Sequence, residues 1–180
     1  MRNLTSKIAF ITTVCVSIAL SGCQTAEVGK KDPKKATQVR TQLAVEYLKT
    51  GDLDSAKRAL DEALKINSRD AQANMMMGVL LQQEGSRLNL DRAETYFKRA
   101  ISAEPKNAQA RNNYGTYLYQ LERYNDAIEQ FAIAGATLGY DQRYLALENM
   151  GRIYLKQGDL VNAEKSFKQA LQANRDSYVS

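Results

Sequence analysis

The sequence predicts an all-α protein in which about four helix pairs stack into a solenoid over residues 37–177. Three observations support this prediction. One pattern of small and large residues recurs four times along the chain. Its Ala-x3-Phe-x2-Ala spacing (i, i+4, i+7) places the pattern on one face of a helix. Gly and Asp divide the units, because Gly ends helices and Asp caps the next one.

The recurring pattern has four positions. A small residue in the first helix is followed by a small residue in the second helix, then a large apolar residue four positions later, then an alanine after three more. These positions hold Ala44, Gly78, Gly115 and Gly151; Ala56, Ala93, Ala127 and Ala163; Leu60, Phe97, Phe131 and Phe167; and Ala63, Ala100, Ala134 and Ala170. Small residues at a helix crossing let two axes approach closely, and the large side chain fills the space beside them.

The predicted units are residues 37–70, 71–107, 108–141 and 144–177. The first, with "LAVEYLKTGDLDSAKRALDEALKIN", divides at Gly51-Asp52. The second, with "MGVLLQQEGSRLNLDRAETYFKRAISAEP", has a longer inter-helix loop and ends at Pro105. The third contains "YGTYLYQLERYNDAIEQFAIAGATLG". The fourth, with "MGRIYLKQGDLVNAEKSFKQALQAN", divides at Gly158-Asp159 and is preceded by two extra residues, Gln142 and Arg143.

A period of about 34 residues with this pattern resembles the tetratricopeptide repeat (TPR). The resemblance covers residues 37–177 and implies a right-handed solenoid of tandem helix pairs. A lone pair could not bury its apolar faces, so the units must stack. The alternative is a single-domain four-helix bundle.

Residues 1–22 have the features of a lipoprotein signal peptide. Arg2 and Lys7 make the start positive, and residues 8–20 form an apolar core, shorter than the roughly 20 residues of a membrane span. One interpretation is an ordinary secretory signal, or a poor membrane anchor, in which Cys23 has no role. We favour the other, in which "LSGC" (residues 20–23) resembles a bacterial lipobox and Cys23 becomes the acylated N-terminus.

Lipidation would account for the cysteine content. Cys15 lies in the segment that would be removed, so the mature chain would keep one cysteine and form no internal disulfide. Residues 23–36 would then be a flexible, lysine-bearing tether, either solvated or attracted to anionic head groups or peptidoglycan. In bacterial lipoproteins, as the resemblance implies, Gln24 after the cysteine favours the outer membrane. We therefore expect a lipid anchor on its periplasmic side.

The composition argues against several classes of function. The chain contains no histidine and carries a net charge of +5, of which residues 1–22 contribute two charges. No Cys/His metal cluster, Ser-His-Asp arrangement or glycine-rich phosphate loop can be assembled. We therefore expect no enzymatic activity, no cofactor or metal and no small-molecule substrate. Interspersed charges and export argue against a nucleic-acid partner.

A stacked-helix solenoid presents a concave face built from the first helix of each repeat. By resemblance to the TPR family, the groove on this face would be lined by Val45, Leu48 and Lys49; Met75, Val79, Gln82 and Gln83; Asn112, Thr116, Tyr119 and Gln120; and Glu148, Arg152, Leu155 and Lys156. Its apolar members in the first two repeats predict a patch that suits the apolar face of an amphipathic helix. The alternative is that some of them pack against the tether or a neighbouring helix.

A lipobox, a short tether and tandem TPRs together resemble the type IV pilus pilotin lipoproteins of the PilF/PilW family. "ARNNYGTYLYQLERYNDAIEQF" and "ALENMGRIYLKQGD" are similar to that family's middle repeats. The resemblance implies a protein that escorts the secretin subunit to the outer membrane and promotes its assembly. The alternatives are a lipidated TPR subunit of the outer-membrane barrel-assembly machinery and an adaptor of peptidoglycan enzymes.

Family members usually continue with further repeats, whereas this sequence stops at "NRDSYVS". We therefore expect the last helix to carry an exposed apolar strip bordered by Leu171, Ala170 and Lys168.

Overall fold

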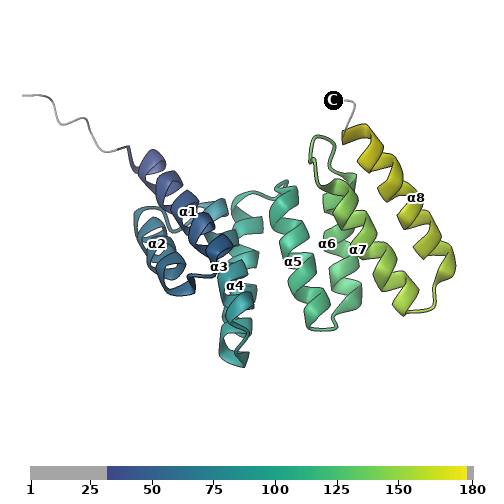
Figure 1. The fold of residues 1–180 in the computed structure, drawn as a ribbon, viewed down its shortest axis with the longest axis horizontal. Helices are drawn as coiled ribbons and strands as arrows, with labels where there is room; N and C mark the ends of the chain where they lie inside the picture. The colour runs from purple at the N-terminus through teal and green to yellow at the C-terminus, as the bar shows by residue number, and fades with distance from the viewer. Residues whose placement is uncertain (1–31, 178–180) are drawn as a thin grey trace, which may run out of the picture. The chain divides into compact units, whose positions relative to one another are not determined.

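The computed structural model describes residues 32–177, all of whose regular structure is helical. In chain order the helices are α1 (Pro33–Thr50), α2 (Leu53–Ile66), α3 (Ala71–Glu84), α4 (Arg87–Ala103), α5 (Ala108–Gln120), α6 (Tyr124–Ala136), α7 (Arg143–Lys156) and α8 (Leu160–Ser177) (Figure 1). The predicted signal peptide, Cys23 and the tether as far as residue 31 lie outside the described residues. None of the described helices has the length and apolar content needed to cross a membrane.

The eight helices of the described chain form four pairs, as predicted. Each pair packs face to face: α1 with α2, α3 with α4, α5 with α6, and α7 with α8. The second helix of each pair also contacts the first helix of the next, and the first helices contact one another in the order α1, α3, α5, α7. The described second helices do not contact one another. The fold is therefore a TPR solenoid with a continuous layer of first helices and a layer of second helices.

The first helix begins earlier than predicted. Residues 33–36, assigned above to the flexible tether, belong to α1. Proline is favoured at the first position of a helix, where its missing N–H has no intrahelical partner to lose. The Thr37 hydroxyl donates a hydrogen bond of 2.9 Å to the Pro33 carbonyl, and Thr37 is fully buried. The tether prediction is therefore wrong for these four residues.

Glycines of the first helices contact aromatic rings of the second helices. A Cβ built on Gly78 would lie 2.9 Å from two ring atoms of Phe97, and one on Gly115 would lie 2.8 Å from Cε1 of Phe131. Phe97 and Phe131 are both fully buried. The repeated small and large positions therefore pair with each other across each helix crossing.

The turn inside the third repeat departs from the others. Gly51, Gly85 and Gly158 adopt positive φ angles after α1, α3 and α7. In the third repeat this position is Glu122, whose φ of 59° is the only positive value among the described non-glycine residues. The next residue, Arg123, stands at the N-cap of α6 and makes no side-chain capping bond. Its side chain instead binds the carboxylates of Glu94 and Asp126.

Within the described part of the chain, residues 33–177 belong to one compact unit. The main core of the described chain runs from Ala44 in α1 to Ile153 in α7, and a smaller cluster joins Leu147 to Ala170 and Ala173 of α8. The helix pairs thus bury their apolar faces against one another inside this unit. This unit has its own hydrophobic core, as independently folding domains do.

The last helix is covered on one side only. Among the described helices, α8 contacts α7 alone. Leu171 is 66% exposed and Val161 is 78% exposed, whereas Ala170 is buried. The exposed residues one turn before and after Leu171 are Lys168 and Arg175, which are charged. The predicted apolar strip is therefore wrong, because Ala170 is buried and Leu171 is exposed among charged side chains.

Candidate partner-binding groove

The layer formed by α1, α3, α5 and α7 contains the groove. A cavity of about 440 Å³ lies between α3 and α5 and is lined by Val79, Gln82, Gln83, Asn113, Thr116 and Gln120. The side-chain amide of Gln82 donates a hydrogen bond of 2.9 Å to the Gln120 amide oxygen and so links the two helices across the cavity. Five of these six residues are groove residues named from the sequence. Asn113 is the exception.

A second, smaller hollow continues the groove between α5 and α7. Its volume is about 70 Å³, and its lining is Thr116, Tyr119, Phe131, Asn149 and Arg152. Thr116 lines both cavities, so the two are adjacent. Arg152 is exposed, and its guanidinium lies 4.0 Å from the Glu148 carboxylate, a loose ion pair that leaves it accessible to a partner.

Two tyrosine rings and one lysine lie close together at one end of the groove, where α5, α6 and α7 meet. The rings of Tyr119 and Tyr124 are 5.7 Å apart, and the Lys156 ammonium lies 4.9 Å from the centre of the Tyr124 ring and 6.0 Å from that of Tyr119. A hydrogen bond with Tyr124 raises the pKa of Lys156. This part of the groove combines a permanent positive charge with flat apolar surface.

The predicted apolar patch in the first two repeats is wrong for Met75. Met75 is completely buried in the core and cannot contact a partner in this structure. The reason is that α3 contacts α1, α2, α4 and α5, which together cover most of its surface, including the part that carries Met75. Val45, Leu48 and Val79 are half-buried and pack against the same core. The groove near α1 and α3 is therefore less apolar than its sequence indicates.

Of the other groove residues named from the sequence, Thr116, Tyr119 and Arg152 line the cavities, whereas Asn112 lines neither. Thr116, Tyr119 and Arg152 are exposed, and Asn112 is half-buried with an amide oxygen that has no hydrogen-bond partner among the described residues. Asn113 and Asn149, which the family positions did not include, line the cavities instead. Asn113 and Asn149 directly follow the family positions Asn112 and Glu148, and only the packing of the helices shows which of two adjacent residues lines a cavity.

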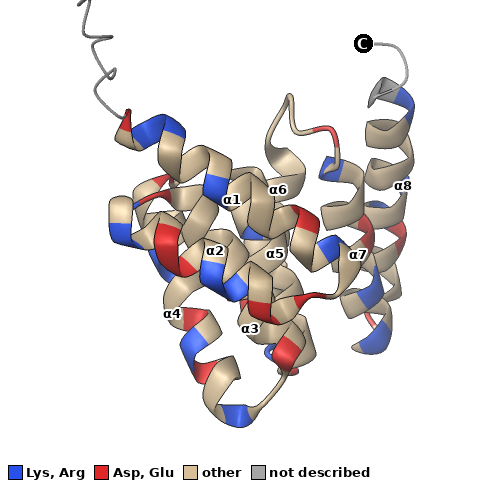
Figure 2. Cartoon of the chain, turned by 60° about the vertical axis from the view of Figure 1, so that its left-hand side comes forward, with Lys and Arg blue, Asp and Glu red and all other residues tan. Residues whose placement is uncertain are grey.

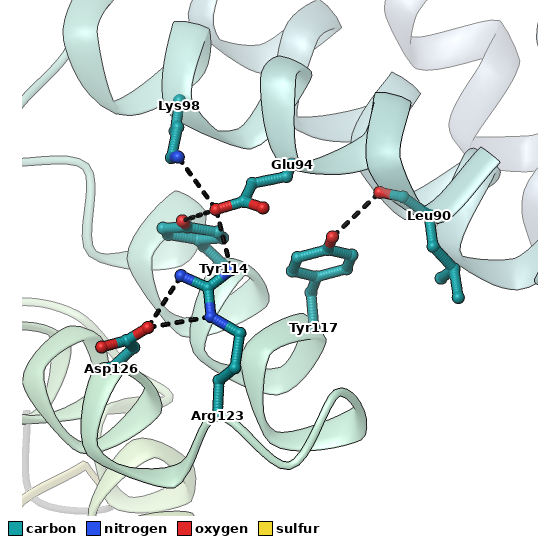
Figure 3. A network of polar contacts seen from close by, with 7 residues as sticks. All are labelled: Leu90, Glu94, Lys98, Tyr114, Tyr117, Arg123 and Asp126. Carbon is teal, nitrogen blue, oxygen red and sulfur yellow. Dashed lines mark hydrogen bonds and ion pairs between the residues drawn. The ribbon is translucent and has the colours of Figure 1, made fainter. Parts of the chain in front are cut away.

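A polar network behind the groove joins the second and third repeats (Figure 3). The Glu94 carboxylate of α4 accepts hydrogen bonds of 2.9 Å from the Tyr114 hydroxyl of α5 and from the guanidinium of Arg123, and it pairs with Lys98. Arg123 also binds Asp126 of α6 at 2.7 Å. The network therefore connects three helices, and it was not predicted because Glu94 and Arg123 are far apart in sequence.

The electrostatics of the network favour its charged form. Partial burial by itself would raise the pKa of Glu94, but hydrogen bonds from Lys98, Arg123 and Tyr114 outweigh this and lower it to about 2. Burial, together with the Glu94 carboxylate, raises the pKa of Tyr114. Burial raises the pKa of Tyr117 to about 12, and the Tyr117 hydroxyl donates to the Leu90 carbonyl at 2.9 Å. These bonds hold α5, which carries Thr116 and Tyr119, in a set position against α4.

The site thus offers amides, a hydroxyl, tyrosine rings and two accessible cations on a continuous helix layer. These groups can bind a peptide segment through hydrogen bonds and charge. Within residues 32–177, no group of three or more His, Cys, Asp or Glu side chains could hold a metal ion. Along the described helices seen in Figure 2, Lys and Arg are interspersed with Asp and Glu.

Family models described as tetratricopeptide repeat match residues 37–70, 84–137 and 144–177. A curated relative, the type IV pilus assembly protein PilF of Pseudomonas aeruginosa, is 29% identical over 168 residues, covering 89% of this chain and 65% of its own length. The solved structure of Pseudomonas aeruginosa PilF has a TM-score of 0.75 at 30% identity, covering 81% of this chain and 64% of that one.

PilW, a type IV pilus biogenesis factor, has a TM-score of 0.69 at 31% identity, covering 76% of this chain and 61% of that one. This chain therefore spans a little under two thirds of the length of these relatives. The repeat matches lie on the helix pairs described above. The chain belongs to the tetratricopeptide-repeat family, and within it resembles the PilF and PilW proteins.

Proposed function

We propose that this protein acts in type IV pilus biogenesis as a pilotin, an outer-membrane lipoprotein that binds the pilus secretin subunit and promotes its localisation and assembly. The observation that carries the proposal is the similarity to both PilF and PilW across the repeats, at 30% and 31% identity. The TPR architecture agrees with a role in binding another protein rather than in catalysis.

The groove supplies the chemistry for such a partner. The amides around the α3/α5 cavity can hydrogen-bond to the polar edge of a bound segment, while half-buried Val79 offers apolar contact. Arg152 and Lys156 favour a segment with acidic residues near α7. In this proposal, an acyl chain on Cys23 holds the complex at the periplasmic side of the outer membrane.

A substitution that fills the groove tests the role of this surface. Thr116 is exposed and lines both cavities, so Thr116→Arg places a long side chain in both without entering the core. Thr95→Arg is the matched control, because Thr95 is exposed on α4, in the layer of second helices. We expect Thr116→Arg to weaken secretin binding by at least tenfold and Thr95→Arg to leave it unchanged.

The cellular experiment is complementation of a deletion strain. Wild type and Thr95→Arg should restore pili, twitching motility and secretin in the outer membrane, whereas Thr116→Arg should not. Full activity of a folded Thr116→Arg protein would refute the groove. A deletion strain with normal pili and normally located secretin would refute the pilus function itself.

A further inference from the structure

A cavity of about 340 Å³ lies between α6, α7 and α8, away from the groove. Its walls include Ala136 of α6, Leu147 and Met150 of α7, and the side chains of Gln169 and Gln172 of α8. Arg143, the first residue of α7, also lines it. None of these residues lines either cavity of the groove. The cavity is thus mainly apolar, with two amides and one guanidinium.

Arg143 is half-buried, and one nitrogen of its guanidinium has no partner. Its Nε atom is buried and has no hydrogen-bond partner among the described residues, where its side chain makes no ion pair. A buried donor without a partner is unfavourable, and more so when it belongs to a cation. Arg143 is also one of the two extra residues that precede the fourth repeat, so its presence there is a local feature of this sequence.

The preceding repeat shows how an arginine at such a cleft can be satisfied internally. Arg111 of α5 stands four residues before Gly115, as Leu147 of α7 stands four residues before Gly151. Its Nε donates to the Pro105 carbonyl at 2.9 Å, and its NH1 donates to the Gln130 amide oxygen at 2.8 Å. Arg111 thereby links the end of α4 to α6. In the fourth repeat this position is Leu147, and Arg143 stands four residues earlier, where the described residues offer its Nε no acceptor.

From this arrangement we infer that the α6–α8 cavity binds a small amphiphilic carboxylate. The carboxylate accepts hydrogen bonds from Arg143, which suits the guanidinium geometry. The alkyl part lies against Ala136, Leu147 and Met150. The volume falls at the lower end of the range of about 300–1,000 Å³ typical of small-molecule sites, and a mainly apolar wall with a few polar groups is their usual composition. The inference does not depend on the proposed role in pilus biogenesis.

Octanoate is the probe, titrated into the compact unit of residues 33–180 and followed by amide chemical shifts. We expect saturable shifts at Ala136, Leu147 and Gln169 and weaker binding of 1-octanol, which has the same chain without the charge. Arg143→Gln should weaken octanoate binding by about tenfold or more. Lys165→Gln, which removes an exposed cation of α8 outside the cavity, should change it less than twofold.

A second variant separates binding from folding. Arg143→Met keeps a long apolar side chain and removes the unpaired cation, so its melting temperature should equal or exceed that of wild type while octanoate binding is lost. Three results would overturn the inference. Octanoate could fail to shift these amide signals, or it could shift only signals of the α3/α5 groove. The third result is that the Arg143→Gln and Arg143→Met proteins bind octanoate as tightly as wild type. A protein partner captured on this face in the absence of octanoate binding would likewise overturn it.

Discussion

Replacing Gly115 by alanine should destabilise the protein, whereas the same change at Gly151 should not. A Cβ on Gly115 would lie 2.8 Å and 2.9 Å from two ring atoms of Phe131, and one on Gly151 would lie 2.9 Å and 3.0 Å from the same atoms of Phe167. The close contacts are nearly equal, but the freedom of the rings is not. Phe131 is fully buried in α6, which contacts both α5 and α7, whereas Phe167 is half-buried in α8, which contacts α7 alone among the described helices.

Two opposing effects, helix propensity and overpacking of the core, set the change in the free energy of unfolding. Alanine is favoured over glycine inside a helix by about 1 kcal/mol, and inserting a methyl group into a filled core costs about 1–3 kcal/mol. At Gly115 the ring is fully buried and borders only the hollow of about 70 Å³ between α5 and α7, so its movement is restricted and we expect a net loss of about 1–2 kcal/mol. At Gly151 the ring can shift outward by a few tenths of an ångström, which reduces the cost of overpacking. The preference for alanine over glycine in a helix is then the larger effect, and we expect a gain in stability of about 0.5 kcal/mol.

Urea denaturation followed by far-UV circular dichroism measures the difference, which should be about 2 kcal/mol between the two variants. Hydrogen exchange of the α5 and α6 amides should locate the loss in Gly115→Ala. Phe131→Leu provides the control, because a smaller side chain makes room for the new methyl group and should reduce the cost of Gly115→Ala. Equal stability of the two alanine variants, or an unchanged cost in the Phe131→Leu background, would refute the argument that the confinement of the ring decides the outcome.

Three further outcomes are expected. Glu122→Gly should stabilise the chain by about 1 kcal/mol in thermal or urea unfolding, because Glu122 has a φ of 59° that glycine adopts without strain; a destabilised variant would contradict this. The pKa of Glu94 is lowered from 4.5 to about 2, so its contribution to stability is present above pH 4.5 and declines as the pH falls toward 2. The difference in unfolding free energy between wild type and Glu94→Gln should therefore be constant above about pH 5 and shrink in acid. A difference that does not change with pH down to about pH 2 would show that the ion pairs of Glu94 are not its source. Cys23→Ala should abolish palmitate incorporation, because only that thiol can accept the diacylglyceryl group, and label retained in the variant would disprove the lipobox.

The sequence by itself determines the four helix pairs of residues 37–177 and most of the places where they divide. These features depend on near neighbours in the chain. A Gly-Asp pair ends one helix and caps the next, and a spacing of i, i+4, i+7 marks one helix face. The pairing of Gly78 with Phe97 and of Gly115 with Phe131 follows from the same register. The similarity to PilF and PilW was likewise recognisable from the repeats.

Only the tertiary structure decides what covers each face and which distant charges meet. Periodicity identifies a face of α3, but it does not show that four helices surround it and bury Met75. Glu94 and Arg123 meet because α5 packs against α4 and places the turn between α5 and α6 beside Glu94. The cavity beside Arg143 exists because the side chains between α6 and α8 leave a space that no local pattern records. Helix formation follows from interactions within a few residues, whereas burial and charge pairing depend on residues that the fold brings together.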